Sequence, residues 1–172
     1  MRLYLQRHAE PFPGPPMDGS RALTNEGKRQ AREMAAFLRK QIGRVDIVIS
    51  SPFARAMETA DIMADALGSY VTNSKMLEPD GEPEAMWKEI ERLAQLSKEV
   101  LVVGHDPSIN ALLGWLISGG AVRFEHGAIA HVKVKRRDPG QLVAKLHWFV
   151  DVPIVEREEE QEVVEAALAM LA

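Results

Sequence analysis

The sequence Val100-Leu101-Val102-Val103-Gly104 places four aliphatic residues in a row and ends them with a glycine. A strand that is apolar on both faces is buried on both faces, and such strands lie in the interior of a sheet. These residues therefore predict a central strand. The polar sequence His105-Asp106-Pro107 follows it at once.

Four further short segments are expected to form strands. Residues 3–7 and 45–50 precede the central strand in the chain, and residues 128–134 and 142–149 follow it. Asp138-Pro139-Gly140 separates the last two segments, and a glycine that can adopt positive φ favours a tight turn there. The last two strands are thus expected to form a hairpin.

Apolar residues at helical spacing separate the predicted strands. Thr24 is a suitable N-cap for the first helix, and Gly43 follows its last turn. The predicted helices cover residues 24–42, 52–67, 84–96, 107–117 and 156–171. Because strands alternate with helices, we predict an α/β fold with a mostly parallel sheet, which the final hairpin makes mixed.

The length and composition suit one domain over residues 1–172, since neither an internal repeat nor a long linker divides the chain. Hydrophobic residues make up 46% and charged residues 27%, which excludes a mainly disordered chain. No run of about 18 apolar residues predicts a membrane-spanning helix. Arg2 and Arg7 interrupt the N-terminus too early for a signal peptide, so a cytoplasmic location is expected.

The sequence has no cysteine, which excludes a disulfide framework, a thiolate nucleophile and a cysteine-ligated metal. The net charge of −4 weakly disfavours nucleic acid as a partner, but its distribution is uneven. Residues 1–60 carry ten Lys or Arg and six Asp or Glu, whereas residues 154–172 carry one Arg and six Glu. This acidic C-terminal helix fits a solvated face packed on the domain, and it also fits a dimer or partner surface.

Three predicted strands end in polar residues that could bind a ligand or take part in catalysis. They are Arg7-His8, Ser50-Ser51 with Arg55 one helical turn further, and His105. Parallel strands end at one edge of a sheet, where ligands of open α/β sheets bind. Guanidinium groups match phosphate oxygens, so convergence of these side chains would make an anion site. Each residue alone is more often a packing group or a solvated charge, and the spacing leaves both interpretations open.

Four segments resemble motifs of the histidine phosphatase superfamily. Residues 5–10 resemble its Arg-His-Gly signature, with Ala9 in the place of the glycine. Residues 23–27 resemble its Leu-Thr segment, residues 50–60 its Ser-Pro helix start, and residues 102–107 its second histidine motif. The segments also stand in the order that this family has.

This resemblance implies a three-layer α/β/α, phosphoglycerate-mutase-like fold in a minimal form without a cap domain. The short chain is most similar to the small phosphohistidine phosphatases of the SixA type. The implied function is that of a phosphatase acting on a phosphohistidine-containing protein. A small phosphorylated metabolite as the substrate is one alternative, and a non-catalytic phosphate-binding or scaffold module is another.

The resemblance also implies roles for single residues. His8 would be the nucleophile and form a phosphohistidine intermediate, while Arg7, Arg55 and His105 would bind the phosphoryl oxygens and stabilise the transition state. A backbone carbonyl near the end of the strand could hold the second ring nitrogen of His8. No metal or other cofactor is expected, and neither a nucleic acid nor a membrane as partner.

The general acid is sought in the loop after the second helix, from which larger members of the family supply a carboxylate. Glu78 is the first candidate, and Asp80 and Glu82 lie in the same loop. An ordinary polar loop is the alternative interpretation.

Ser51 stands before a proline at the expected start of a helix. It is predicted to be the N-cap of that helix rather than a phosphate ligand. Among the later histidines, His126 could touch a ligand because the hairpin approaches the site there, whereas His131 and His147 are expected to be strand residues without a catalytic role.

Overall fold

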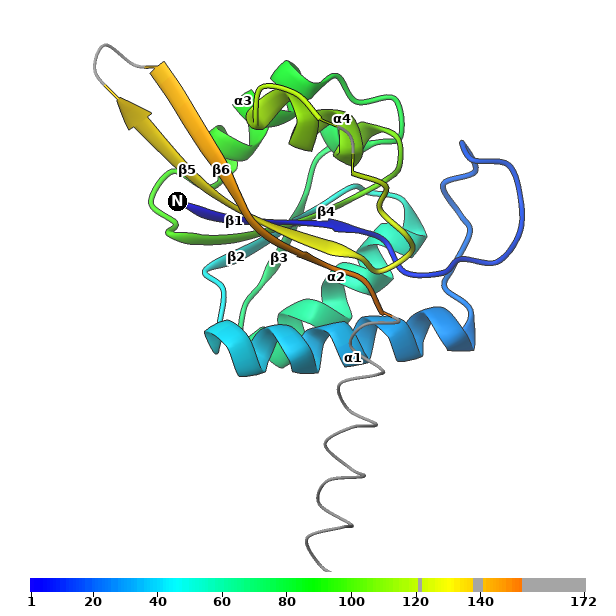
Figure 1. Cartoon of the computed structure of the whole chain (residues 1–172). Coiled ribbons are helices and arrows are strands. Elements are labelled where there is room, and N and C mark those ends of the chain that lie inside the picture. The colour runs from blue at the N-terminus through cyan, green and yellow to red at the C-terminus, as the bar shows by residue number, and fades with distance from the viewer. Residues whose placement is uncertain (121, 138–140, 153–172) are drawn as a thin grey trace, which may run out of the picture.

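The computed structural model describes residues 1–120, 122–137 and 141–152, and Figure 1 shows its elements around a central sheet. The strands are β1 (Arg2–Arg7), β2 (Ile47–Ser50), β3 (Val71–Asn73), β4 (Glu99–Gly104), β5 (Ile129–Arg137) and β6 (Gln141–Val150). The helices are α1 (Asn25–Ile42), α2 (Ala54–Leu67), the short 3-10 helix η1 (Lys75–Leu77), α3 (Pro83–Leu93) and α4 (Ser108–Leu116).

The six strands form one sheet in the order β3-β2-β4-β1-β5-β6. The pairs β2–β3, β2–β4 and β1–β4 are parallel, whereas β5 runs antiparallel to both β1 and β6. The predicted mixed, mostly parallel α/β sheet is therefore confirmed. The β4 strand lies between β2 and β1, and its residues 100–104 are buried, as a strand without a polar face requires.

Helices cover both faces of the sheet, which gives the three layers that were predicted (Figure 1). On one face, Leu3 and Val102 belong to a core with residues of α3 and α4. On the other face, Tyr4 and Leu101 belong to a core with residues of α1 and α2. Successive residues of a strand point to opposite faces, so each central strand contributes to both cores.

Several boundaries differ from those predicted. The β3 strand was not predicted, because it is three residues long and lies at the sheet edge. The α3 helix ends at Leu93 rather than at residue 96. The hairpin joining β5 and β6 is confirmed, but its turn at 138–140 and the predicted acidic helix at 154–172 lie outside the described residues. No helix within the described ranges is both long and apolar enough to cross a membrane.

The start of α1 is fixed against the chain that follows β1. Thr24 caps the helix as predicted, since its Oγ1 accepts a hydrogen bond from Gly27 N at 2.9 Å. The same hydroxyl donates to the Glu10 carboxylate at 2.8 Å. A Cβ at Gly27 would overlap the backbone carbonyl of Glu10. The absence of a side chain at Gly27 thus lets the helix start lie close to the residues after His8.

We predict that Gly27→Ala destabilises the protein by about 2 kcal/mol, because the new methyl group must displace backbone rather than a flexible side chain. The better helix propensity of alanine offsets only part of this loss. Thermal and urea unfolding measure the effect. The matched control is Gly43→Ala at the other end of α1, where a Cβ meets no atom within 4 Å and only the φ of 80° is unfavourable. Equal stability of Gly27→Ala and the wild-type protein would contradict the overlap.

Candidate active site

The predicted strand ends meet at one edge of the sheet. Arg7 on β1 pairs with Gly104 on β4, and Ser50 on β2 pairs with Val103, so the three carboxyl ends are level. Beyond them lies a cavity of about 360 Å³. The residues that line it are Arg7, His8, Pro11, Pro13, Gly14, Pro16, Arg21, Arg55, Pro79, His105, Asp106 and His126. Four of the five predicted site residues, namely Arg7, His8, Arg55 and His105, are therefore brought together.

His8 is held by both of its ring nitrogens. Its Nδ1 lies 2.7 Å from the backbone oxygen of Ala9, and the Arg55 Nε donates to its Nε2 at 3.1 Å. A carbonyl can only accept and a guanidinium can only donate, so the proton is on Nδ1 and a lone pair is on Nε2. Burial, followed by the nearby charge of Arg55, lowers the pKa of His8 to about 2. His8 is therefore a neutral imidazole with a lone pair on Nε2, as a nucleophilic histidine requires.

The backbone around His8 is tied to α2. Thr59 Oγ1 accepts from the Ala9 N–H at 3.1 Å and donates to the Arg55 carbonyl at 2.7 Å. Because Thr59 and Ala9 are fully buried, these bonds fix the end of β1 against the first turns of α2. Thr59 lies one helical turn after Arg55, and this spacing lets its hydroxyl bond the Arg55 carbonyl and the Ala9 N–H together.

Arg55 joins His8 to the loop of residues 11–22. Its Nη1 and Nη2 donate to the carbonyls of Asp18 and Pro16 at 2.9 and 2.8 Å, and its guanidinium lies 5.0 Å from the centre of the Phe53 ring. The side chain is almost fully buried, and burial lowers the pKa of the guanidinium to about 10, where it remains charged at neutral pH. One buried cation thus contacts His8 and holds the loop beside it.

Two further arginines make the cavity cationic. Arg7 donates to the Phe124 carbonyl at 2.7 Å and to His126 Nε2 at 3.0 Å, while Arg21 donates to the Phe12 carbonyl at 3.1 Å. The described residues that line the cavity include three guanidinium groups, with Arg55, and a single carboxylate, that of Asp106. An anion with several oxygens, such as phosphate, matches this charge and this set of donors.

His105 lies opposite His8, with the two ring centres 5.0 Å apart. Its Nε2 lies 2.8 Å from Ser51 Oγ, and its Nδ1 is buried without a partner in the part of the chain that the structure describes. Burial, followed by the charge of Arg55, lowers the pKa of His105 to about 3. His105 is consequently a second neutral imidazole.

The prediction that Ser51 is the N-cap of α2 is wrong. The helix begins at Ala54 and its N-cap is Phe53, so Ser51 lies two residues too early to cap it. The buried Ser51 hydroxyl instead accepts from the Phe53 N–H at 3.3 Å and bonds to His105. It therefore supports the second histidine.

The structure does not bring the predicted acid candidates into the cavity. Glu78 ends η1, where its carbonyl accepts from Gly81 N at 2.9 Å, and its neighbour Pro79 lines the cavity instead. Asp80 is exposed and is also absent from the lining. The tight turn after η1 explains this arrangement, because it directs the prolyl ring of this loop towards the site.

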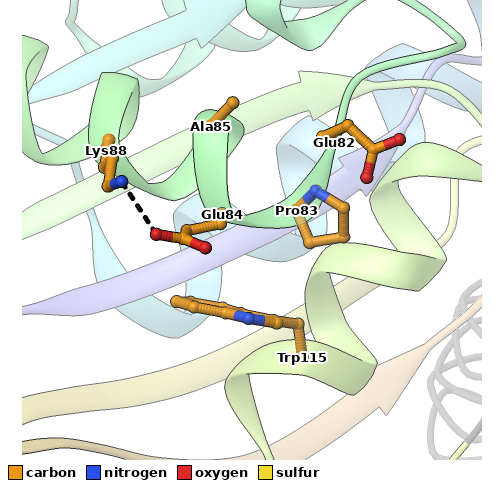
Figure 2. A pocket seen from close by; sticks show the side chains of 6 residues that line it. All are labelled: Glu82, Pro83, Glu84, Ala85, Lys88 and Trp115. Carbon is orange, nitrogen blue, oxygen red and sulfur yellow. Dashed lines mark ion pairs between the residues drawn. The ribbon is translucent and has the colours of Figure 1, made fainter.

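Glu82 belongs to a second hollow, which Figure 2 shows between the start of α3 and Trp115 of α4. This hollow measures about 600 Å³ and shares no lining residue with the cavity at His8. It contains the ion pair of Lys88 and Glu84, 2.7 Å apart, but no histidine or arginine. The larger hollow therefore lacks the histidine and arginine side chains that line the smaller cavity.

Three lining residues with polar or charged side chains were not predicted to belong to the site, namely Arg21, Asp106 and His126. Asp106 could have been predicted, because it directly follows the site residue His105. Arg21 could not, because it lies in a loop whose path the sequence does not specify. His126 was noted only as a residue that could touch a ligand. Within the described ranges, no group of three or more His, Asp or Glu side chains is placed to hold a metal ion.

Comparisons with known proteins agree with this geometry. Residues 3–79 match the model of the Histidine phosphatase superfamily (branch 1). The phosphohistidine phosphatase SixA of Escherichia coli (strain K12) is 28% identical over 144 residues, which cover 81% of this chain and 89% of that protein.

Two solved structures are similar in fold. The protein histidine phosphatase SixA complexed with tungstate has a TM-score of 0.79 at 26% identity, covering 90% of this chain and 99% of the other. The mycobacterial glucosyl-3-phosphoglycerate phosphatase has a TM-score of 0.69 at 17% identity, covering 86% and 98% of the two chains, and shares the fold alone.

We predict that Arg55→Ala weakens the binding of inorganic phosphate at least about tenfold, because it removes a charged donor beside His8 and releases the loop of residues 11–22. Isothermal titration calorimetry measures the dissociation constant. The control is Arg92→Ala, which removes an arginine that pairs with Glu89 on the exposed side of α3. An unchanged phosphate affinity in Arg55→Ala would rule out the assigned contact.

Proposed function

We propose that this chain, a phosphatase whose residues 3–79 match the histidine phosphatase superfamily, hydrolyses phosphohistidine on a partner protein through a phosphohistidine intermediate on His8. The observation that carries this proposal is the neutral, buried His8 ring, whose Nε2 lone pair lies in a cavity with three arginines. A cytoplasmic location, which the sequence predicts, stays a prediction.

In the first step, His8 Nε2 attacks the phosphorus. The Nε2–P bond forms and the P–N bond to the substrate imidazole breaks. The substrate ring leaves as a neutral imidazole, because its distal nitrogen carries a proton taken up from water. Positive charge develops on the His8 ring, and the Nδ1–H bond to the Ala9 carbonyl stabilises it. The Arg55 Nε, which now donates to Nε2, transfers its bond to a phosphoryl oxygen when the nucleophile engages.

Arg7, Arg55 and His105 bind the equatorial oxygens in this proposal, with Arg21 as a fourth group at the wall of the cavity. Their cationic and donor groups stabilise the charge that the oxygens carry in the transition state. In the second step, water attacks the phosphorus, the Nε2–P bond breaks, and inorganic phosphate leaves with His8 neutral again.

Glu78 as the general acid stays a prediction. Its side chain is not among those that line the cavity, although its neighbour Pro79 is. Protonation of the leaving group is less demanding for a phosphohistidine than for a phosphate ester, since a proton on the distal nitrogen of the substrate imidazole lets that ring leave as a neutral molecule.

Phe12 and Met17, which we call the rim of the cavity, favour a protein substrate. Phe12 and Met17 are each 55% exposed, and they belong to the loop that stands out from the sheet edge in Figure 1 and lines the cavity through Pro13 and Pro16. A phosphohistidine side chain is one ring and one methylene group long. The backbone of a partner whose phosphorus reaches His8 would therefore lie against this rim.

A small phosphorylated metabolite is the second candidate substrate. The cavity volume of about 360 Å³ falls within the range of small-molecule sites. A non-catalytic phosphate-binding module is less favoured, because Arg7, His8, Arg55 and His105 all line one cavity.

The first test compares substrates and the nucleophile. We predict that the wild-type protein dephosphorylates a phosphohistidine-containing phosphotransfer domain with a higher kcat/KM than any of a panel of sugar and nucleotide phosphates. His8→Ala should lose at least about a thousandfold in kcat on every substrate, since the attacking atom is gone. Faster turnover of a small phosphate would contradict the protein substrate, and retained activity in His8→Ala would contradict the nucleophile.

The second test concerns the rim. The double substitution Phe12→Ala and Met17→Ala should lower kcat/KM for the phosphohistidine protein about tenfold, because it removes exposed apolar contact area. The same variant should keep kcat/KM for a chromogenic phosphate ester within about twofold of the wild type. The control is Leu96→Ala, an exposed apolar residue outside the cavity lining. Equal losses on both substrates would show that the rim shapes the cavity rather than contacts a partner.

A further inference from the structure

The segment from Phe124 to Gly127 joins α4 to β5 and lies beside the end of β1. Gly127 N donates to the His8 carbonyl at 3.2 Å, and the buried Gln6 side chain donates to the Gly127 carbonyl at 3.2 Å. Phe124 is fully buried in the core, where its ring meets Phe149 edge to face. The segment is thus anchored at both of its ends.

From this anchored segment, two groups hold Arg7. The Phe124 carbonyl accepts from Nη1 at 2.7 Å, and His126 Nε2 accepts from Nη2 at 3.0 Å. A guanidinium is planar, so one bond at each terminal nitrogen fixes its rotation as well as its position. Arg7 Nε is buried without a partner in the described part of the chain. Donors of Arg7 therefore remain available for an anion in the cavity.

His126 can perform this task only in one protonation state. Because the guanidinium donates, Nε2 must carry a lone pair and the ring proton must be on Nδ1. Burial, followed by the charge of Arg7, lowers the pKa of His126 to about 4, so the ring is neutral at physiological pH. Its centre lies 5.5 Å from that of His8, and it lines the same cavity.

We propose that His126 is a positioning residue that holds the Arg7 guanidinium in its phosphate-binding orientation by accepting a hydrogen bond from Nη2. The Phe124 carbonyl alone would leave the guanidinium free to turn about the Nη1 contact. With His126 present, the orientation is set before the anion arrives, and binding does not have to order the side chain. This inference rests on the proposed function only in assigning phosphate binding to Arg7.

The substitutions His126→Ala and His126→Gln separate an acceptor role from simple filling of space. At pH 7.5, His126→Ala should weaken inorganic phosphate binding about tenfold in calorimetry, because Arg7 loses one of its two anchors. His126→Gln should stay within about threefold of the wild type, since its amide oxygen can accept from Nη2. His147→Gln is the control at an exposed histidine of β6.

Nitrogen NMR of the wild-type imidazoles reports which ring nitrogen carries the proton. A role of His126 in packing alone would not require a particular protonation state. We expect an unprotonated Nε2 and a protonated Nδ1 for His126 at pH 7.5. Thermal melting of each variant identifies loss of fold. Equal weakening of phosphate binding in the alanine and glutamine variants, an unchanged affinity in the alanine variant, or a protonated Nε2 would each overturn the proposal.

Phosphate binding requires no turnover, so these outcomes stand apart from the proposed function. If the wild type binds phosphate and the His126 variants behave as expected while phosphohistidine protein is not hydrolysed, the substrate assignment fails and the role of His126 is kept. If hydrolysis is found but the alanine variant binds phosphate normally, only the role of His126 fails.

Discussion

The site depends on one buried imidazole held between an acceptor and a donor. The Ala9 carbonyl fixes the proton of His8 on Nδ1, and the Arg55 guanidinium points at the lone pair on Nε2. A buried neutral histidine is compatible with neighbouring cations, whereas a charged one would be repelled by them. The cationic surroundings that suit an anion therefore also keep His8 neutral, and the hydrogen bonds from the end of β1 to Thr59 and Gly127 preserve this geometry.

Much of the fold could be predicted because its signals are local. An unbroken apolar run identified β4, helical spacing identified α1 to α4, and the convergence of Arg7, His8, Arg55 and His105 followed from parallel strand ends. The short edge strand β3 was missed because three residues hold too little pattern. Its pairing with β2 depends on contacts that only the assembled sheet provides.

The parts of the site that were missed depend on backbone paths outside helices and strands. Ser51 was expected at a helix start, and its contact with His105 became visible only when the true start at Ala54 was known. Glu78 was placed by sequence position, but a tight turn brings Pro79 to the cavity instead. His126 lies far from Arg7 in the chain, and no local pattern predicts that the two meet.

The anchoring of the loop at 11–22 has a consequence for how such a protein could change over evolutionary time. Arg55 donates hydrogen bonds to the carbonyl oxygens of Pro16 and Asp18 in this loop. An isolated antiparallel β-bridge between Pro11 and Leu23 joins the two ends of the loop. Carbonyl groups are common to every amino acid, so these anchors are indifferent to most side chains. Residues such as Phe12 and Met17 can then vary without disturbing the position of Arg55. In a phosphatase built this way, the exposed side chains of the loop can change in evolution while the backbone contacts that position Arg55 are kept.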